Sequence, residues 1–221
     1  DYISEFLNTK TASKIFNERG KFDLIVALNV IPHTPNNIDL LKGVRILLEG
    51  RGFLIMEGAY ALETILNGEF DTIYHEHVYT FSLHSLISTF RMAGLTVVDV
   101  ERIPTQGGSL RIYAMKDEHA EEVSKSVIDL LNQEKTTGLA NLETYKAIGP
   151  KVENYRKEML RIVQEEKKHG KLIGLGAPAR GVVIMYYCGI TKDDMEFVIY
   201  DTPGKQGQVV AGVNIPVKSL A

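Results

Sequence analysis

Cysteine is almost absent from this sequence, with Cys188 the only one among 221 residues. A single cysteine excludes an intramolecular disulfide and any Cys-rich zinc site within this chain. No apolar run reaches the roughly 20 residues of a membrane-spanning helix, and no signal peptide opens the sequence. We therefore expect no membrane partner and interpret the chain as a cytoplasmic globular protein.

A strong charge of one sign is lacking as well. The formal net charge is −3, so the composition does not favour binding to nucleic acid or to an anionic membrane. What the chain does have is an apolar fraction of 44%. That fraction is enough to bury a core in one large domain or in two small ones.

The first half of the sequence alternates between helical and strand patterns. Apolar runs at 22–30 and 52–60 predict buried strands, and we expect the first to be covered on both faces. The helix after them is predicted to begin at an N-cap, Ser82, and to end at Gly94. Two more strands flank the sequence TQGG. This alternation predicts a mainly parallel sheet with helices on both faces.

The second half predicts a separate α/β unit. A charged stretch of helical segments, with little sign of a core, reads as a connector. A long amphipathic helix, KVENYRKEMLRIVQEEKKHG, then begins at Lys151 and leads into a strand, a glycine turn, a helix and another strand. The predicted boundaries are 1–116, 117–150 and 151–221.

The glycine turn of this second unit is GLGAPARG. Gly174 and Gly176 allow a tight turn and close approach to a ligand, and the helix that follows offers free N–H groups to an anion such as phosphate. Arg180 adds a cation. Ala179 stands where the dinucleotide pattern G-x-G-x-x-G requires its third glycine, so a plain strand-to-helix connection remains the alternative.

Two further motifs follow predicted strands at their carboxyl ends, where α/β sheets bind ligands. In YDTPGKQG, Asp201 could accept a hydrogen bond from a sugar hydroxyl and Lys205 could meet a phosphate. In LNVIPHTPNN, Asn29 and His33 occupy the corresponding place in the first unit. Taken alone, each motif also fits a solvated turn.

The segment FDTIYHEHVYTFSLHS holds three of the chain's six histidines. A zinc site would use His75 and His77, with His84 or Glu76 as a third ligand. Tyr79, however, stands where H-E-x-x-H requires its second histidine. We therefore expect no metal site here.

Acid–base chemistry is the better interpretation of this segment. Histidine titrates near neutral pH, and a neighbouring tyrosine can donate a hydrogen bond to a developing oxyanion. A loop could bring Tyr74, Glu76 and His77 together around one reacting group.

The order of the motifs along the chain is similar to the order in a known enzyme family. NVIPHTPN, GFLIMEGAY, FDTIYHEHVYTFS, PTQGGSLRIYA, GLGAPARG and DTPGKQGQVVAGVNIPV follow one another as in the S-adenosylmethionine-dependent C-methyltransferases typified by the deoxysugar C-3 methyltransferases. The most specific pieces are Y-x-E-H, G-G-S-x-R and D-x-P-x-K-Q-G. The resemblance covers nearly the whole chain.

The resemblance implies a fold and a division of the chain. The fold class is α/β: a partial Rossmann-like methyltransferase sheet plus a second Rossmann-like α/β unit that binds a nucleotide sugar, joined by a helical connector. The family's Cys-rich zinc module and its first cofactor-binding strands are not in this sequence, which begins without methionine. We therefore expect a fragment that binds S-adenosylmethionine weakly or not at all.

The resemblance also implies roles for particular residues. His77 would be the base that removes a proton beside a ketone, Tyr74 would stabilise the enolate oxygen, and Glu76 would orient the pair. His75 falls where the family varies and is given no role. Cofactor contacts are expected from Asn29 and His33. The expected substrate contacts are Gly107, Gly108, Arg111, Gly174, Gly176, Arg180, Asp201 and Lys205.

Two departures from the family pattern bear on the substrate. Gln106 stands where the family commonly has histidine before the Gly-Gly pair, so acid–base chemistry is lost at that position. Arg180 replaces the usual lysine, which keeps the charge and changes the geometry.

The predicted function is methylation of a carbon next to a ketone in a nucleotide-linked sugar. The alternatives are a nucleotide-binding module without catalysis and a nicotinamide-dependent oxidoreductase. The oxidoreductase is weakened by the missing third glycine. In this fragment the strand at 22–30 has a strongly apolar edge. We expect a homodimer through that edge, or a rearranged N-terminal segment that covers the strand.

Overall fold

The computed structural model describes residues 2–120 and 122–220. These residues form two compact units. The N-terminal unit runs to Glu69 and resumes at His75–Tyr145, and the C-terminal unit combines Phe70–Tyr74 with the chain from Lys146 onward. The division at Tyr145 and Lys146 falls inside the connector predicted at 117–150. The short piece Phe70–Tyr74, which belongs with the C-terminal unit, was not predicted.

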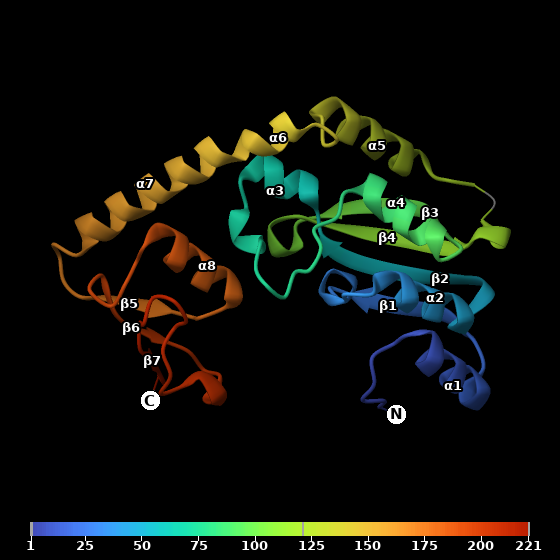
Figure 1. Ribbon diagram of the computed structural model, residues 1–221, viewed down its shortest axis with the longest axis horizontal. Helices are drawn as coiled ribbons and strands as arrows, with labels where there is room; N and C mark the ends of the chain where they lie inside the picture. Colours follow the sequence, from blue (N-terminus) through green and yellow to red (C-terminus); the bar gives the residue numbers. More distant parts are fainter. Residues whose placement is uncertain (1, 121, 221) are drawn as a thin grey trace. The chain divides into compact units, whose positions relative to one another are not determined.

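The N-terminal unit is built on a four-stranded sheet with the order β1-β2-β4-β3 (Figure 1). The strands are β1 (Phe22–Leu28), β2 (Leu48–Ala59), β3 (Leu95–Ile103) and β4 (Ser109–Lys116). β1 and β2 are parallel, whereas β4 runs antiparallel to both of its neighbours. β1, β2 and β3 therefore run in the same direction, as expected for a mainly parallel sheet, and β4 is reversed because a short turn joins it to β3.

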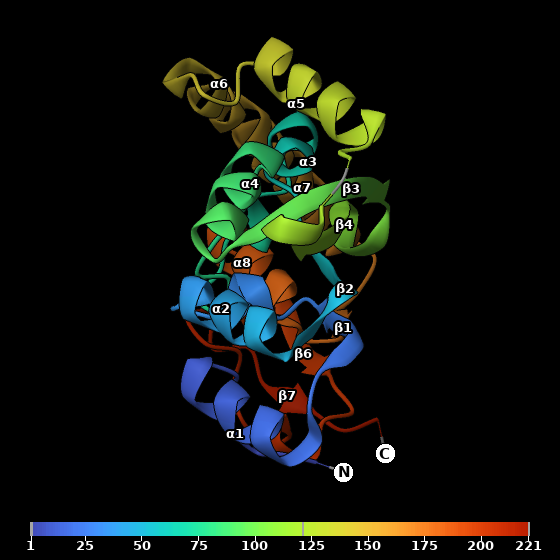
Figure 2. The ribbon, with the colours of Figure 1, turned by 90° about the vertical axis from the view of Figure 1, so that its right-hand side faces the viewer.

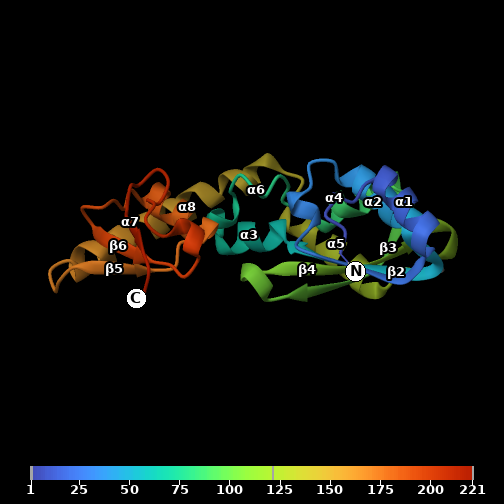
Figure 3. The same ribbon diagram turned by 90° about the horizontal axis from the view of Figure 1, so that it is seen from below.

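Helices cover one face of this sheet. They are α1 (Thr9–Arg19), α2 (Asn37–Leu47) and α4 (Leu83–Met92), and Figures 2 and 3 show α2 and α4 on the same side of the strands. Leu54, Met56 and Ile112 are fully buried beneath them. Ser82 caps α4, as predicted, because its hydroxyl accepts from the backbone N–H of Ser85 while the Ser85 hydroxyl accepts from that of Ser82.

The opposite face of the sheet is open at β1. Leu24, Val26 and Leu28 share this face, and about half of each side chain is exposed. The prediction that this strand is covered on both faces is wrong for the described residues. β1 is also one of the two edge strands of the described sheet, as expected for a strand with an unpaired apolar edge.

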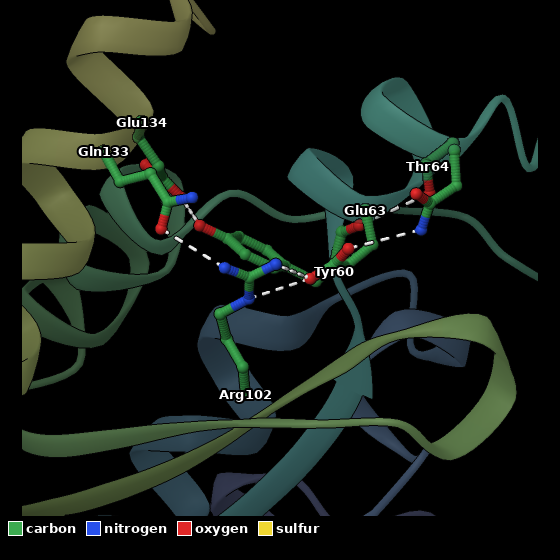
Figure 4. A network of polar contacts seen from close by, with 7 residues as sticks. Tyr60, Glu63, Thr64, Arg102, Gln133 and Glu134 are labelled. Carbon is green, nitrogen blue, oxygen red and sulfur yellow. Dashed lines mark hydrogen bonds and ion pairs between the residues drawn. The ribbon is translucent and has the colours of Figure 1, made fainter.

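The predicted connector begins with a helix that packs on the N-terminal unit. This helix, α5 (Lys125–Thr137), buries Val127 and Leu130. Glu134 on the same face is only 3% exposed, and its carboxylate accepts from the Tyr60 hydroxyl at 2.9 Å (Figure 4). It also accepts from the backbone N–H of His84 at 3.1 Å. The segment from 125 to 137 therefore has core contacts that its charged sequence did not predict.

Short elements complete the N-terminal unit. They are α3 (Ala61–Asn67), α6 (Leu142–Lys146), which spans the division between the units, and the single-turn 3₁₀ helices η1 (Ile31–His33), η3 (Thr105–Gly107) and η4 (Asp117–His119). α3 is tied to β3 by the ion pair between Glu63 and Arg102, and Arg102 also donates to Gln133 of α5 (Figure 4).

The C-terminal unit is a three-stranded parallel sheet with the order β5-β6-β7. Its elements are η2 (Phe70–Thr72), α7 (Ile148–Glu166), β5 (Leu172–Leu175), α8 (Ala179–Cys188), β6 (Met195–Ile199), η5 (Pro203–Lys205) and β7 (Val217–Lys218). Cys188, Val198 and Ile215 are among its core residues. The predicted order of helix, strand, glycine turn, helix and strand is present. Across the described residues, the structure contains no helix with the length and apolar character needed to cross a membrane.

Candidate functional site

Two histidines from distant parts of the sequence meet in the N-terminal unit. The ring centroids of His33 and His77 are 4.8 Å apart. His33 Nδ1 lies 2.8 Å from the backbone carbonyl oxygen of Glu76, so a proton on Nδ1 would be donated to that carbonyl. The residue predicted to line the cofactor site is therefore next to the residue predicted to act as the base.

A turn at the end of β1 makes this meeting possible. Asn29 adopts a left-handed backbone conformation, with φ +53°, and its N–H donates to the carbonyl of Glu57 in β2. The chain then enters η1, which ends at His33. Asparagine tolerates this conformation better than most residues. The side chains of Asn29 and His33 thereby stand at the carboxyl ends of two parallel strands, where α/β sheets bind ligands.

A tyrosine holds the second half of the histidine motif in place. Tyr79 donates its hydroxyl to the carbonyl of Pro35 at 2.8 Å, and its backbone N–H donates to the carbonyl of Pro32 at 3.3 Å. Residues 76–79 are thus fixed along the loop that follows β1 by three hydrogen bonds. Sequence reasoning treated Tyr79 only as the residue that breaks a zinc motif.

The other acid–base candidates are placed less closely together. Glu76 is exposed, and its carboxylate lies 3.8 Å from His75 Nε2 in an exposed pair. Tyr74 belongs to the C-terminal unit, whereas Glu76 and His77 belong to the N-terminal unit. The convergence of Tyr74 with Glu76 and His77 stays a prediction.

Arg111 is held by carboxylates on the open face of the sheet. Its Nε donates to Glu57 at 2.6 Å, directly across the strand pair, and Glu101 lies 3.4 Å from a terminal nitrogen. The hydrogen bond that Arg111 donates to Glu57 is the main reason that the pKa of Arg111 is raised. Glu57 is largely buried, and sequence reasoning missed it, although it is the one acidic residue in the apolar run of β2.

Gly107 and Gly108 serve the packing of their own unit. Both have positive φ angles, +88° and +129°, and side chains there would run into Glu69 and Glu63. Gln106 before them is also left-handed, with φ +55°. The G-G-S-x-R motif therefore makes a tight turn into β4, the strand that carries Arg111. A direct substrate contact by either glycine stays a prediction.

The two glycine-rich motifs of the C-terminal unit do come together. The N–H of Gly176 donates to the carbonyl of Ile199 at 2.8 Å, and Lys205 donates to the carbonyl of Ala177 at 3.1 Å. Lys205 also lies 4.7 Å above the ring of Tyr200. GLGAPARG and YDTPGKQG thus form one edge at the carboxyl ends of β5 and β6, with Asp201 exposed beside it.

Gly174 and Arg180 have structural partners at this edge. A side chain at Gly174 would come within 2.7 Å of Met195 and 2.9 Å of Val198, so glycine is needed for the packing of β5 on β6. Arg180 makes a two-pronged ion pair with Asp71, at 2.8 Å from Nε and 3.1 Å from a terminal nitrogen. Asp71 was not singled out by sequence reasoning.

Metal ligands do not gather in the part of the chain that the structure describes. Among those residues there is no group of three or more His, Cys, Asp or Glu side chains that could hold an ion. The three histidines at 75–84 lie apart from one another in their contacts: His77 lies beside His33, His75 is exposed, and His84 is on α4.

Comparison with known proteins matches the chain to methyltransferase families over most of its length. The model of the C-methyltransferase C-terminal domain matches residues 104–221, and a methyltransferase-domain model matches residues 5–100. The chain is 32% identical over 211 residues to C-methyltransferase NovU of Streptomyces niveus, which covers 95% of this chain and 50% of that protein. The chain thus spans about half the length of this curated relative.

Solved structures resemble a part of the chain more distantly. A putative methyltransferase in complex with Haloferax volcanii Trm112 matches with a TM-score of 0.37 and 14% identity, over 43% of this chain and 54% of that one. Magnesium protoporphyrin IX methyltransferase from Synechocystis PCC 6803, with bound SAH, matches with a TM-score of 0.35 and 17% identity, over 43% and 45%.

Proposed function

The chain belongs to the C-methyltransferase family, and on that premise we propose that the intact protein methylates a carbon next to a ketone in a nucleotide-linked sugar. Family membership supports the predicted class of enzyme, the Rossmann-like methyltransferase sheet and S-adenosylmethionine as the cofactor. The sugar substrate and the route through an enolate are our proposal.

The observation that carries the proposal is the contact between His33 and His77. A methyl group can be transferred only if the deprotonated carbon lies within reach of the methyl donor, so the base must stand beside the cofactor. S-Adenosylmethionine supplies an electrophilic methyl group on a sulfonium. Asn29 and His33 fit as part of its wall, because the left-handed turn at Asn29 leaves both side chains at the ligand edge of the sheet.

The chemistry needs one base and one hydrogen-bond donor. His77 takes the proton from the carbon beside the ketone, and the electrons of the broken C–H bond move onto the ketone oxygen as an enolate. Tyr74 donates a hydrogen bond to that oxygen. S-Adenosylmethionine, held in part by Asn29 and His33, would supply the methyl group to the enolate carbon, and its sulfur would keep the electrons of the broken S–C bond. Glu76 orients the pair, and the proton remains on His77 until it passes to solvent.

The nucleotide would bind at the glycine-rich edge of the C-terminal unit. The left-handed Gly176, the N-terminus of α8 and the ammonium of Lys205 provide N–H donors and positive charge suited to a diphosphate. Asp201 is exposed beside them and could accept from a sugar hydroxyl.

For the chain of 221 residues by itself, we propose a homodimer through β1. The exposed apolar side chains of Leu24, Val26 and Leu28 lie on an edge strand of the described sheet. An edge of this kind favours pairing with a second copy.

Solvent exchange tests the function without methyl transfer. The full-length enzyme is incubated in D₂O with a nucleotide-linked 4-keto sugar and no cofactor, and deuterium at the carbon beside the ketone is followed by NMR. We expect exchange with the wild-type enzyme and loss of exchange with His77→Ala. An enzyme that neither exchanges this proton nor methylates any such sugar would contradict the proposal.

A further inference from the structure

The histidine segment, residues 70–79, is held by two separate sets of contacts. Its second half is bonded within the N-terminal unit through His33 and Tyr79. Its first half, Phe70–Tyr74, belongs to the C-terminal unit. Tyr74, the candidate that stabilises the enolate, is therefore the last residue of the piece that belongs to the C-terminal unit. His77, the candidate base, follows three residues later in the N-terminal unit.

The first half of the segment is firmly attached to the C-terminal unit. The ring of Phe70 lies 4.9 Å from that of Tyr187 and 5.6 Å from that of Tyr155. Thr72 is buried. Asp71 receives both bonds of the Arg180 guanidinium, one on each carboxylate oxygen.

The ion pair of Asp71 and Arg180 differs from ordinary surface pairs. Its side chains are 14% and 31% exposed, and its two-pronged geometry fixes orientation as well as distance. Exposed single-contact pairs contribute little to stability or to position. A partly buried, two-pronged pair constrains the backbone on both sides, here η2 and the first turn of α8.

The position of Arg180 gives the pair its significance. Arg180 is the second residue of α8, directly after the glycine turn that we propose for the nucleotide. Asp71 lies three residues before Tyr74. The ion pair therefore joins the nucleotide edge to the part of the segment that carries Tyr74.

We propose that Asp71 and Arg180 are positioning residues, whose ion pair holds Tyr74 in register with the nucleotide-binding edge. This rests on the proposed function and deepens it. It also gives Arg180 a different task from the phosphate contact predicted from sequence, because its guanidinium is directed at a carboxylate of its own chain.

Hydrogen exchange of this chain tests the attachment without any substrate. In Asp71→Asn, we expect the backbone amides of Thr72–Tyr74 to exchange at least about tenfold faster than in the wild type, because local opening becomes easier. Arg161→Gln is the matched control, since it removes an exposed ion pair with Glu158 in the same unit. Unchanged exchange at 72–74 in Asp71→Asn would overturn the inference.

Kinetics of the full-length enzyme test the consequence. We expect Asp71→Asn to lower kcat by about 10- to 100-fold, the usual effect of a misplaced reacting group, with KM for the nucleotide sugar within about threefold of wild type. Arg180→Lys keeps the charge and loses the two-pronged guanidinium contact, so its kcat should lie between those of the wild type and Asp71→Asn. The double exchange Asp71→Arg with Arg180→Asp should recover part of kcat.

The outcomes separate this inference from the proposed function. A higher KM with unchanged kcat in Arg180→Lys would overturn the positioning role and favour a phosphate contact. A wild-type enzyme that is inactive on keto sugars would remove the proposed function, and the exchange comparison would still decide whether the pair holds the segment. If either single variant fails to fold, the other variant and the double exchange carry the test.

Discussion

His33 and His77 lie 44 residues apart in sequence, yet their ring centroids are 4.8 Å apart. One follows the edge strand β1, and the other follows the boundary between the two units. The hydrogen-bonding contact of His33 Nδ1 with the carbonyl of Glu76 fixes the backbone beside His77. A single short contact thus ties the proposed cofactor wall to the backbone beside the proposed base.

His77→Ala should lower the turnover of the full-length enzyme by about two to four decades, which is the usual contribution of a positioned base. Binding of S-adenosylmethionine should change little, because the proposed wall is formed by Asn29 and His33. Turnover is measured by methyl transfer, and cofactor affinity by calorimetry. His84→Ala is the matched control, since His84 belongs to the same sequence motif but is exposed on α4. Equal losses in the two variants would remove His77 from the role of base.

Glu134→Ala should destabilise the N-terminal unit by about 2–4 kcal/mol, because it removes the acceptor of several buried donors. The carboxylate accepts from the Tyr60 hydroxyl and from the first N–H groups of α4, where a negative charge is also favoured by the helix dipole. Burial, and then the Glu134 carboxylate, raise the pKa of Tyr60 far above its usual range, so the phenol stays a donor at any working pH.

Urea unfolding measures this effect, and two variants calibrate it. Glu134→Gln keeps an acceptor oxygen and should lose about 1 kcal/mol, the net worth of a typical hydrogen bond. Asp129→Ala removes an exposed carboxylate from the same helix, where it pairs with Lys125, and should change stability by less than about 0.5 kcal/mol. A Glu134→Ala variant as stable as Asp129→Ala would contradict the structural account of α5.

Local features were predictable from the sequence, because they depend on neighbours along the chain. Ser82 was recognised as a cap from the apolar helix that follows it, and the glycine turn at 174–181 from its spacing. The coverage of β1 was not predictable in this way. An apolar run predicts burial in general, and it cannot say which helices the described chain supplies to which face.

Long-range pairs account for most of what sequence reasoning missed. Asp71 and Arg180 are 109 residues apart, and each looks like an ordinary surface charge in its own segment. Glu134 had a usable signal, because Val127, Leu130 and Glu134 recur at helical spacing and so share one face. A charged residue on an apolar stripe indicates a buried hydrogen-bonding partner. The overall charge of the stretch hides this signal, because it does not show which face Glu134 lies on.

Asp99 should make the attachment of α5 sensitive to acid. Hydrogen bonds from Ser124 first, and then from Ser126, hold the pKa of Asp99 below its usual value, and the Val100 N–H adds to them. A lowered pKa in the folded state means that the stabilisation is complete above the unfolded-state pKa, about 3.9, and is lost as pH falls through the folded value.

The comparison of wild type with Asp99→Asn measures this contribution. The difference in unfolding free energy should be constant from about pH 7 to pH 5 and should shrink as pH falls below about 4, because both proteins are then uncharged at this position. Ser124→Ala should reproduce part of the difference, since it removes the first of the hydrogen bonds. A difference that grows toward acid pH would mean that the sign of the pKa shift is wrong.

Val26→Lys should abolish self-association of this chain. Val26 is 53% exposed in the middle of β1, with Leu24 and Leu28 on the same face, so association through this strand would bury all three. A lysine at an edge strand opposes pairing, because its charge would lose water on contact with a second apolar strand. Sedimentation velocity should give a dimer for the wild type and a monomer for Val26→Lys. Ile128→Lys is the matched control, because Ile128 is equally exposed, at 53%, and lies on α5. If association requires β1, only the strand variant dissociates; dissociation of both variants would indicate a general effect of added charge, and a monomeric wild type would remove the dimer altogether.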